Sequence, residues 1–167
     1  MAVIKCVMVC LAMLPAVASA WETPLQAVEQ FVAWELGGGR LHSDAEGMQQ
    51  HLHLEPDYEG IGADTVLLSS GHRLGKPRCH GSNCTVVVNY QLPALTGEEE
   101  LPLGNGPRAR NERVSYRILA VDGDWRIDSG SLTDTPIINA QTLAAHTAML
   151  AADDEPADQT QGPANDL

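Results

Sequence analysis

In this 167-residue chain, two cysteines lie close enough in the sequence to bind one metal ion together or to form a disulfide. Cys79 and Cys84 enclose the short segment His80-Gly81-Ser82-Asn83. Two thiolates and His80 could bind a metal ion, but a tetrahedral site needs a fourth ligand, and the neighbouring sequence offers none. In an oxidising compartment two cysteines usually pair instead. We therefore predict a disulfide between Cys79 and Cys84 that adds about 2 kcal/mol of stability.

A second candidate for metal binding is the sequence His51-Leu52-His53. On an extended strand the two imidazoles would share a face and could bind one ion. The pattern predicts a short helix instead, which begins near Ser43-Asp44-Ala45-Glu46 and runs through Leu52. On that helix the two rings point about 200° apart. We therefore expect solvated histidines and predict no metal site.

Glu35 is the single residue best placed for acid–base chemistry. On a helical wheel it falls between Phe31 and Val28, at the edge of an apolar stripe. A carboxyl group at that edge could face a cavity and act as a general acid or base. Its place just before Gly37-Gly38-Gly39 also lets it reach water, which is the simpler interpretation. We assign no catalytic residue and keep Glu35 as a candidate only.

Five aromatic residues fall on or near the faces that the pattern turns inward: Phe31, Trp34, Tyr90, Tyr116 and Trp125. They could line a pocket for a small apolar ligand, with two tyrosine hydroxyls as hydrogen-bond donors. They could equally form the core, because aromatic side chains supply much of the buried area of a small domain. No phosphate-binding loop, nucleotide fingerprint or nucleophilic serine motif is present, so we predict no cofactor.

The charge balance limits the possible partners. Lys and Arg number 10 against 22 Asp and Glu, which gives a net charge of −12. This excess of acid argues against nucleic acid and anionic membrane surfaces, and it favours a basic protein partner through electrostatic steering. Glu98, Glu99 and Glu100 lie within the long segment 93–112, which is rich in Pro and Gly. They are our candidates for contact with such a partner.

The first twenty residues have the pattern of a cleaved signal peptide. Lys5 precedes an unbroken apolar run from Cys6 to Leu14, and Ala18-Ser19-Ala20 supplies small residues for cleavage. The run is too short to cross about 30 Å of hydrocarbon as a helix. We therefore expect an exported protein, periplasmic or secreted, cleaved near Ala20 and with no membrane span.

Residues 21–152 are predicted to form one α+β domain, followed by a disordered acidic tail over 153–167. Thr23 and Pro24 begin a helix whose apolar stripe continues to Leu36, where the three glycines end it. Thr135-Pro136 is predicted to begin a C-terminal helix that runs to about Ala152.

Alternation of period two predicts about four antiparallel strands, over Thr65–Leu74, Thr85–Leu92, Arg113–Val121 and Trp125–Gly130. Asp122-Gly123 is a typical two-residue hairpin turn. With that turn Val121 faces Asp124, and Ala120 then opposes Trp125, Leu119 opposes Arg126 and Ile118 opposes Ile127. Tyr116 would oppose Ser129, and Arg117 would meet Asp128 on the exposed face. We expect Trp125→Ala to destabilise the protein far more than Asp128→Asn.

The order of these elements, the sequence "ELGGGRL" from Glu35 to Leu41 and the hairpin "VSYRILAVDGDWRID" from Val114 to Asp128 resemble the nuclear-transport-factor-two-like superfamily. The resemblance covers roughly Trp21 to Gly130 and concerns architecture. It implies a cone-shaped α+β fold in which N-terminal helices pack on a curved antiparallel sheet. Isomerases, hydratases, ligand binders and interaction modules all use this fold, so it selects no activity.

The interpretation we favour is an exported, non-enzymatic binding protein that takes a basic protein partner or a small apolar ligand. One alternative is an isomerase- or hydratase-like enzyme with Glu35 and a tyrosine as acid and base. Another is an accessory component of an envelope assembly. Oligomeric state is left open by the sequence.

Overall fold

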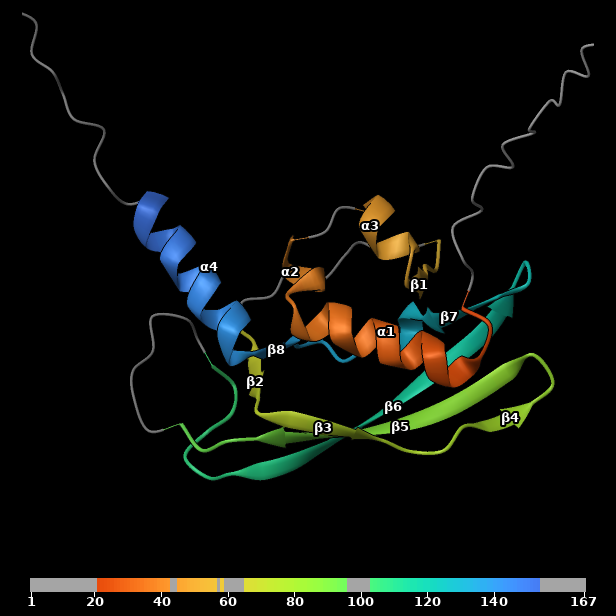
Figure 1. Cartoon of the computed structure of the whole chain (residues 1–167), viewed down its shortest axis with the longest axis horizontal. Coiled ribbons are helices and arrows are strands. Elements are labelled where there is room, and N and C mark those ends of the chain that lie inside the picture. The colour runs from red at the N-terminus through yellow and green to blue at the C-terminus, as the bar shows by residue number, and fades with distance from the viewer. Residues whose placement is uncertain (1–20, 43–44, 57, 59–64, 96–102, 154–167) are drawn as a thin grey trace, which may run out of the picture.

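The computed structural model describes residues 21–42, 45–56, 58, 65–95 and 103–153 (Figure 1). The predicted signal segment, the residues Glu98-Glu99-Glu100 and the tail from residue 154 lie outside this part of the chain. Helices and strands follow in the order α1 Pro24–Leu36, α2 Gly39–His42, α3 Ala45–Gln49, β1 Leu52–His53, β2 Leu67–Ser69, β3 Gly71–Leu74, β4 Arg78–His80, β5 Asn83–Leu92, β6 Arg110–Val121, β7 Asp124–Asp128, η1 Ser129–Ser131, β8 Ile137–Asn139 and α4 Ala140–Asp153. This is an α+β fold with a C-terminal helix, as the sequence predicts.

Helix α1 begins at Pro24 and ends at Leu36, as its sequence predicts. The side chain of Thr23 accepts a hydrogen bond from the backbone N–H of Gln26 at 3.2 Å, and Gln26 in turn accepts one from the N–H of Glu22. These bonds satisfy N–H groups that a helix start leaves unpaired. The buried side of the helix packs against the sheet through Ala27, Val28, Phe31 and Val32.

The main sheet contains six of the described strands, in the order β1-β7-β6-β5-β3, with β4 also paired to β5. All pairs are antiparallel except β1 with β7. The sheet curves around α1, and the ends of the long strands β5 and β6 extend beyond it (Figure 1). The strand count exceeds the predicted four because β1 and β4 are too short to show alternation. The buried residues of β5 and β6 facing α1 are Cys84, Val86, Val88, Tyr90, Leu92, Val114, Tyr116 and Ile118.

The predicted hairpin register between β6 and β7 is confirmed for its first four pairs, from Val121–Asp124 to Ile118–Ile127. Asp122 and Gly123 both have positive φ angles, 52° and 91°. A two-residue turn of this kind matches the right-handed twist of the flanking strands. Trp125 is partly buried against the core, while Ala120 opposite it is exposed at the end of the sheet.

The predicted contact between Arg117 and Asp128 is present, but the last pair of the predicted register is wrong. Tyr116 and Ser129 do not pair, because the chain leaves the sheet after Asp128 and forms η1. Asp128 is 2% exposed, whereas we expected it on the solvated face. Its carboxylate accepts a hydrogen bond from the N–H of Gly130 at 3.3 Å and pairs with Arg117. Asp128 is therefore buried at the position where it caps η1.

The predicted strand Thr65–Leu74 is two strands in two different sheets. Strand β2 pairs in parallel with β8, and β3 pairs with β5. All three residues of β2 are buried, which fits a strand covered on both sides. The chain changes direction at Ser70, whose N–H donates to the carbonyl of Gln91. Alternation does not reveal such a break.

The C-terminal helix begins later than predicted, at Ala140 instead of near Thr135. Ile137 and Ile138 are completely buried in β8, where their branched side chains pack well. Asn139 then caps the helix, since its side-chain oxygen accepts a hydrogen bond from the N–H of Thr142 at 2.8 Å. No helix in the described part of the chain is long and apolar enough to cross a membrane.

The region of His51 also differs from its prediction. Helix α3 ends at Gln49, and Leu52–His53 forms the short strand β1. The ring of His51 stacks between two indoles, at centroid distances of 4.8 Å from Trp34 and 5.9 Å from Trp21. This histidine therefore lies among aromatic rings and is half-buried, instead of on a solvated helix. Burial lowers its pKa.

Cys79 and Cys84 form the predicted disulfide. The two residues lie directly opposite each other in the ladder between β4 and β5, with a Cα–Cα distance of 4.0 Å. Cys84 is buried in the core and Cys79 is exposed. The bond ties the short strand β4 to the long strand β5.

Candidate functional site

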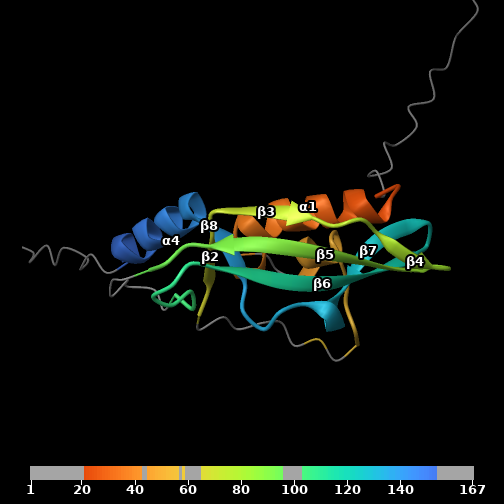
Figure 2. The ribbon, with the colours of Figure 1, turned by 90° about the horizontal axis from the view of Figure 1, so that it is seen from below.

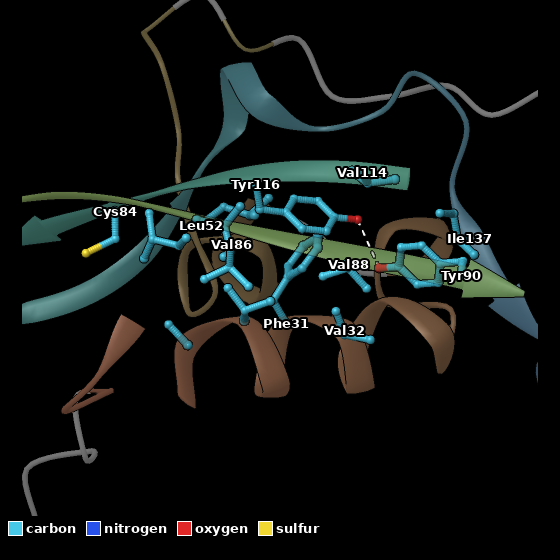
Figure 3. Packing of buried hydrophobic residues seen from close by; sticks show 14 of the residues in the cluster. Phe31, Val32, Leu52, Cys84, Val86, Val88, Tyr90, Val114, Tyr116 and Ile137 are labelled. Atoms are coloured by element: carbon cyan, nitrogen blue, oxygen red, sulfur yellow. Dashed lines mark hydrogen bonds between the residues drawn. The ribbon is translucent and has the colours of Figure 1, made fainter. Parts of the chain in front are cut away.

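The interface between α1 and the inner face of the sheet contains three of the five aromatic candidates. Phe31, Tyr90 and Tyr116 have no exposed surface, and all three belong to the main hydrophobic cluster. The two tyrosine hydroxyls share a hydrogen bond of 3.0 Å, and the ring of Phe31 packs edge-on against Tyr116 (Figure 3). Burial raises the pKa of both tyrosines, so they are neutral phenols near neutral pH.

Trp34 and Trp125, the other two aromatic candidates, lie at the margin of this cluster and are partly buried. Trp34 contacts Phe31 and His51, and Trp125 donates its backbone N–H to the carbonyl of Trp21. All five residues thus belong to one hydrophobic cluster or pack against it. A ligand pocket among them stays a prediction.

Glu35 is buried, so the solvated side chain that we expected is wrong. It is 1% exposed and forms an ion pair with Arg40, which is 4% exposed. Arg40 Nε donates to Glu35 Oε2 at 2.6 Å, and its Nη2 donates to Oε1. The same Oε1 accepts the backbone N–H of Ile137 at 2.9 Å. A carboxylate with both oxygens occupied in this way is poorly placed to accept a proton from a substrate.

Arg40 links the N-terminal helices to the segment before β8. Its Nη1 donates to the carbonyl of Thr133 at 2.7 Å. Burial by itself would lower the pKa of Arg40, but the hydrogen bond and the charge of Glu35 more than offset this and raise it. Arg40 therefore stays protonated inside the protein.

The three glycines make this pairing possible. Gly38 has a φ of 84°, a conformation that glycine adopts at little cost. A Cβ on Gly39 would lie 2.1 Å from the ring of Trp34, so only glycine fits there. The chain can therefore reverse sharply after α1 and return Arg40 to Glu35.

The outer face of the sheet, which points away from α1, has a different chemistry. Directly paired residues on antiparallel strands share a face. One row crosses three strands, from Arg73 on β3 through Asn89 on β5 to Arg113 on β6. All three side chains are exposed. Figure 2 views the sheet from this side, with β3, β5 and β6 next to one another.

A second row lies farther along the same strands. It runs from Arg78 on β4 through Thr85 on β5 to Arg117 on β6, and again all three residues are exposed. In both rows a neutral polar side chain of β5 lies between two arginines. The outer face thus repeats one pattern, with cations on both sides of a hydrogen-bonding group.

A shallow hollow of about 430 Å³ lies beside the first row. It is lined by one guanidinium group and three carboxamides, from Arg73, Asn89, Gln91 and Asn111. A second hollow of about 310 Å³ shares Gln91 and Asn111 with it and extends to Arg110. The larger hollow thus combines a fixed positive charge with groups that both donate and accept hydrogen bonds.

The arginines of the outer face fall into two groups. Arg117 pairs with Asp128, and Arg126 pairs with Asp124 at 3.5 Å. Arg73, Arg78 and Arg113 have no acidic partner within the described residues. Three uncompensated cations on one face are unexpected in a chain of net charge −12. The outer face is therefore a local cationic surface on an acidic protein.

The described segments contain no group of three or more His, Cys, Asp or Glu residues that could hold a metal ion. His53 lies on β1 and His80 on β4, in separate parts of the sheet. The candidates Glu98, Glu99 and Glu100 lie outside the described residues, so their contact with a basic partner stays a prediction.

Sequence patterns alone did not single out the residues of the outer face or Arg40. A signal for the former was present, because Asn89 and Gln91 alternate with the apolar residues of β5 and Arg113 with those of β6. What the sequence lacks is the cross-strand register that places arginines from β3 and β6 on both sides of Asn89. The signal for Arg40 was an acid and a base separated by Leu36 and three glycines.

No family model matches the sequence, and no curated protein and no solved structure has significant similarity to it. The functional assignment therefore rests on the chemistry of the two faces.

Proposed function

We propose that this chain is an exported, non-enzymatic binding protein that recognises an anionic partner with the outer face of its sheet. The observation that carries the proposal is that Arg73, Arg78 and Arg113 have no acidic partner among the described residues, and that Arg73 lines a hollow together with three carboxamides. Exposed guanidinium groups are well suited to bind carboxylates and similar anions, since they form paired, charge-assisted hydrogen bonds. Within this proposal the chain has the cone-like architecture of the nuclear-transport-factor-two-like superfamily.

The inner face supports a binding function over an enzymatic one. Glu35 is bound by Arg40, and the hydroxyls of Tyr90 and Tyr116 bind each other. An isomerase or hydratase with Glu35 and a tyrosine as acid and base would have to break these buried interactions first. Contact of Glu98-Glu99-Glu100 with a basic partner is a separate proposal.

The proposal is tested by titrating the isotope-labelled mature protein with dextran sulfate, a generic polyanion, and with neutral dextran. Amide shifts should change on β3, β5 and β6 with the polyanion only, and Arg113→Gln should reduce them. Arg126→Gln is the matched control, because it removes the same charge where Asp124 already compensates it. Absence of shifts, or shifts that Arg113→Gln leaves unchanged, would contradict the proposed surface.

A further inference from the structure

The spacing of the arginines suits an extended ligand with several charges. Neighbouring strands lie about 4.8 Å apart, so the backbones of Arg73 and Arg113 are about 10 Å apart, on opposite sides of Asn89. The second row crosses β5 at Thr85, four positions from Asn89, or about 13 Å along the strand. A single small anion would contact the guanidinium groups of one row and leave the other row unused. The repeat favours a polymer whose negative charges recur.

The carboxamides show that charge is only part of the recognition. Asn89, Gln91 and Asn111 each present an NH₂ donor and a carbonyl acceptor to the hollow. The carbonyl oxygens would repel a ligand that consists of anionic oxygens alone. They are useful where the ligand also carries hydroxyl groups, which donate and accept in the same way. The hollow therefore fits a ligand that carries both anionic and hydroxyl groups.

The outer face lacks the features that other polyanions use. Single-stranded nucleic acids stack their bases on aromatic rings. The described outer-face positions of β5 and β6 contain none; they are Asn83, Thr85, Val87, Asn89, Gln91, Asn111, Arg113, Ser115, Arg117 and Leu119. Peptides commonly add a strand to a sheet edge through main-chain hydrogen bonds. Strand β5 beneath the hollow is already paired on both sides, with β3 and β6, so a ligand over the hollow meets side chains, whereas a peptide that adds a strand would have to join the outer edge of β3.

We propose that this face binds an acidic polysaccharide, a polymer of sugars that carry carboxylates. Arg73 and Arg113 bind the carboxylates of nearby sugars, and Arg78 extends the contact along the polymer. The carboxamides of Asn89, Gln91 and Asn111 bind the sugar hydroxyls. This inference rests on the proposed function, because it names the chemical class of the anionic partner for the same surface.

The test measures calorimetric binding of the mature protein to four soluble polymers at two salt concentrations. Polygalacturonate carries carboxylates on a sugar backbone, and its methyl ester has the same backbone without the charge. Polyglutamate carries carboxylates on a peptide backbone, and dextran sulfate carries sulfates on sugars. We expect the strongest binding to polygalacturonate, weaker binding to polyglutamate and dextran sulfate, and none to the ester.

Variants separate the contributions of charge and hydroxyl recognition. Arg113→Gln should weaken binding to polygalacturonate at least about tenfold, the usual effect of losing a charge-assisted pair. Arg126→Gln should change it less than about twofold. Gln91→Leu should weaken binding to polygalacturonate about tenfold and leave the affinity for polyglutamate unchanged, since it removes a partner for hydroxyls and no charge. Gln91 is exposed, so the variant should fold.

The outcomes distinguish the inference from the proposed function. Preference for polyglutamate or dextran sulfate, with dependence on Arg113, would overturn the polysaccharide assignment and leave an anion-binding surface. Equal losses for Gln91→Leu with polygalacturonate and with polyglutamate would also overturn it. Failure of all four polymers to bind would overturn both the inference and the proposed function.

Discussion

The two faces of strands β5 and β6 differ in whether their polar side chains are already hydrogen-bonded within the protein. On the inner face Tyr90 and Tyr116 are fully buried and bind each other. On the outer face Asn89 and Arg113 pair directly in the ladder, and both are exposed. Residues one step apart on the same strand therefore differ in whether their hydrogen-bonding capacity is already used. The inner face stabilises the fold, and the outer face has groups free for a ligand.

The same contrast holds for charge. Arg40 is buried and fully compensated by Glu35, whereas Arg73 and Arg113 are exposed and uncompensated among the described residues. If the comparison is correct, substitutions on the inner face should change stability and those on the outer face should change binding.

The largest effect is expected for Arg40→Met. The variant leaves the carboxylate of Glu35 buried without its partner, and breaking such a pair costs about 3–5 kcal/mol. Urea unfolding of the mature protein measures this cost. Arg113→Met is the matched control on the outer face and should change stability by less than about 0.5 kcal/mol. Similar costs for the two variants would contradict the distinction between the faces.

The next largest effect is expected for the disulfide. Replacing both Cys79 and Cys84 by serine should cost about 2 kcal/mol, because the bond closes only a short loop of the unfolded chain. The measurement is again urea unfolding, compared with the unmodified protein after chemical reduction. A loss of all cooperative unfolding would mean that β4 and β5 depend on this bond far more than the loop length implies.

A smaller effect is expected from removing one tyrosine hydroxyl. Tyr116→Phe leaves the hydroxyl of Tyr90 without its partner and should cost about 1 kcal/mol. Since burial raises the pKa of both tyrosines, the unfolded chain releases these protons at lower pH than the folded protein. Stability should therefore fall as the pH rises above about 10, the ordinary tyrosine value. Absorbance of more than one tyrosinate before unfolding would contradict this, since only Tyr58 is partly exposed.

His51 provides a test at the opposite end of the pH range. Burial lowers its pKa, so the unfolded chain binds a proton more readily than the folded protein. Stability is fully present above about pH 6.5, the ordinary histidine value, and should decline as the pH falls below it. His51→Phe should keep the ring between Trp21 and Trp34 and reduce this decline. An unchanged pH profile in the variant would assign the decline to other groups.

Much of the fold could be predicted because local patterns and burial agree. Helix α1 has a cap, an apolar stripe and a glycine end, and the β6–β7 hairpin has a turn that fixes its register. The predictions were wrong where contacts between distant parts of the sequence determine the local structure. Leu67–Ser69 and Ile137–Asn139 form a buried parallel pair whose partners are far apart in sequence. Asp128 has the polarity of a surface residue, but it caps η1 from the interior.

The candidate site was harder to predict for a similar reason. The aromatic candidates were correctly grouped, since inward-facing residues follow from alternation alone. The outer-face row depends on the pairing of β3 with β5, which alternation does not specify. Arg73 and Arg113 are far apart in the sequence, and only the three-stranded register places them on both sides of Asn89.

The smallest effect on stability is expected for the double variant Arg73→Gln and Arg113→Gln. Its two cations lie about 10 Å apart, close to the screening length of physiological salt, so their mutual repulsion is weak. Removing them relieves that repulsion but makes an acidic chain more acidic, and the two effects oppose each other. We therefore expect a change within about 0.5 kcal/mol in urea unfolding, together with a loss of polyanion binding. A loss of more than about 1 kcal/mol in the free energy of unfolding would show that these arginines stabilise the fold. The assignment of stability to the inner face and of binding to the outer face would then be wrong.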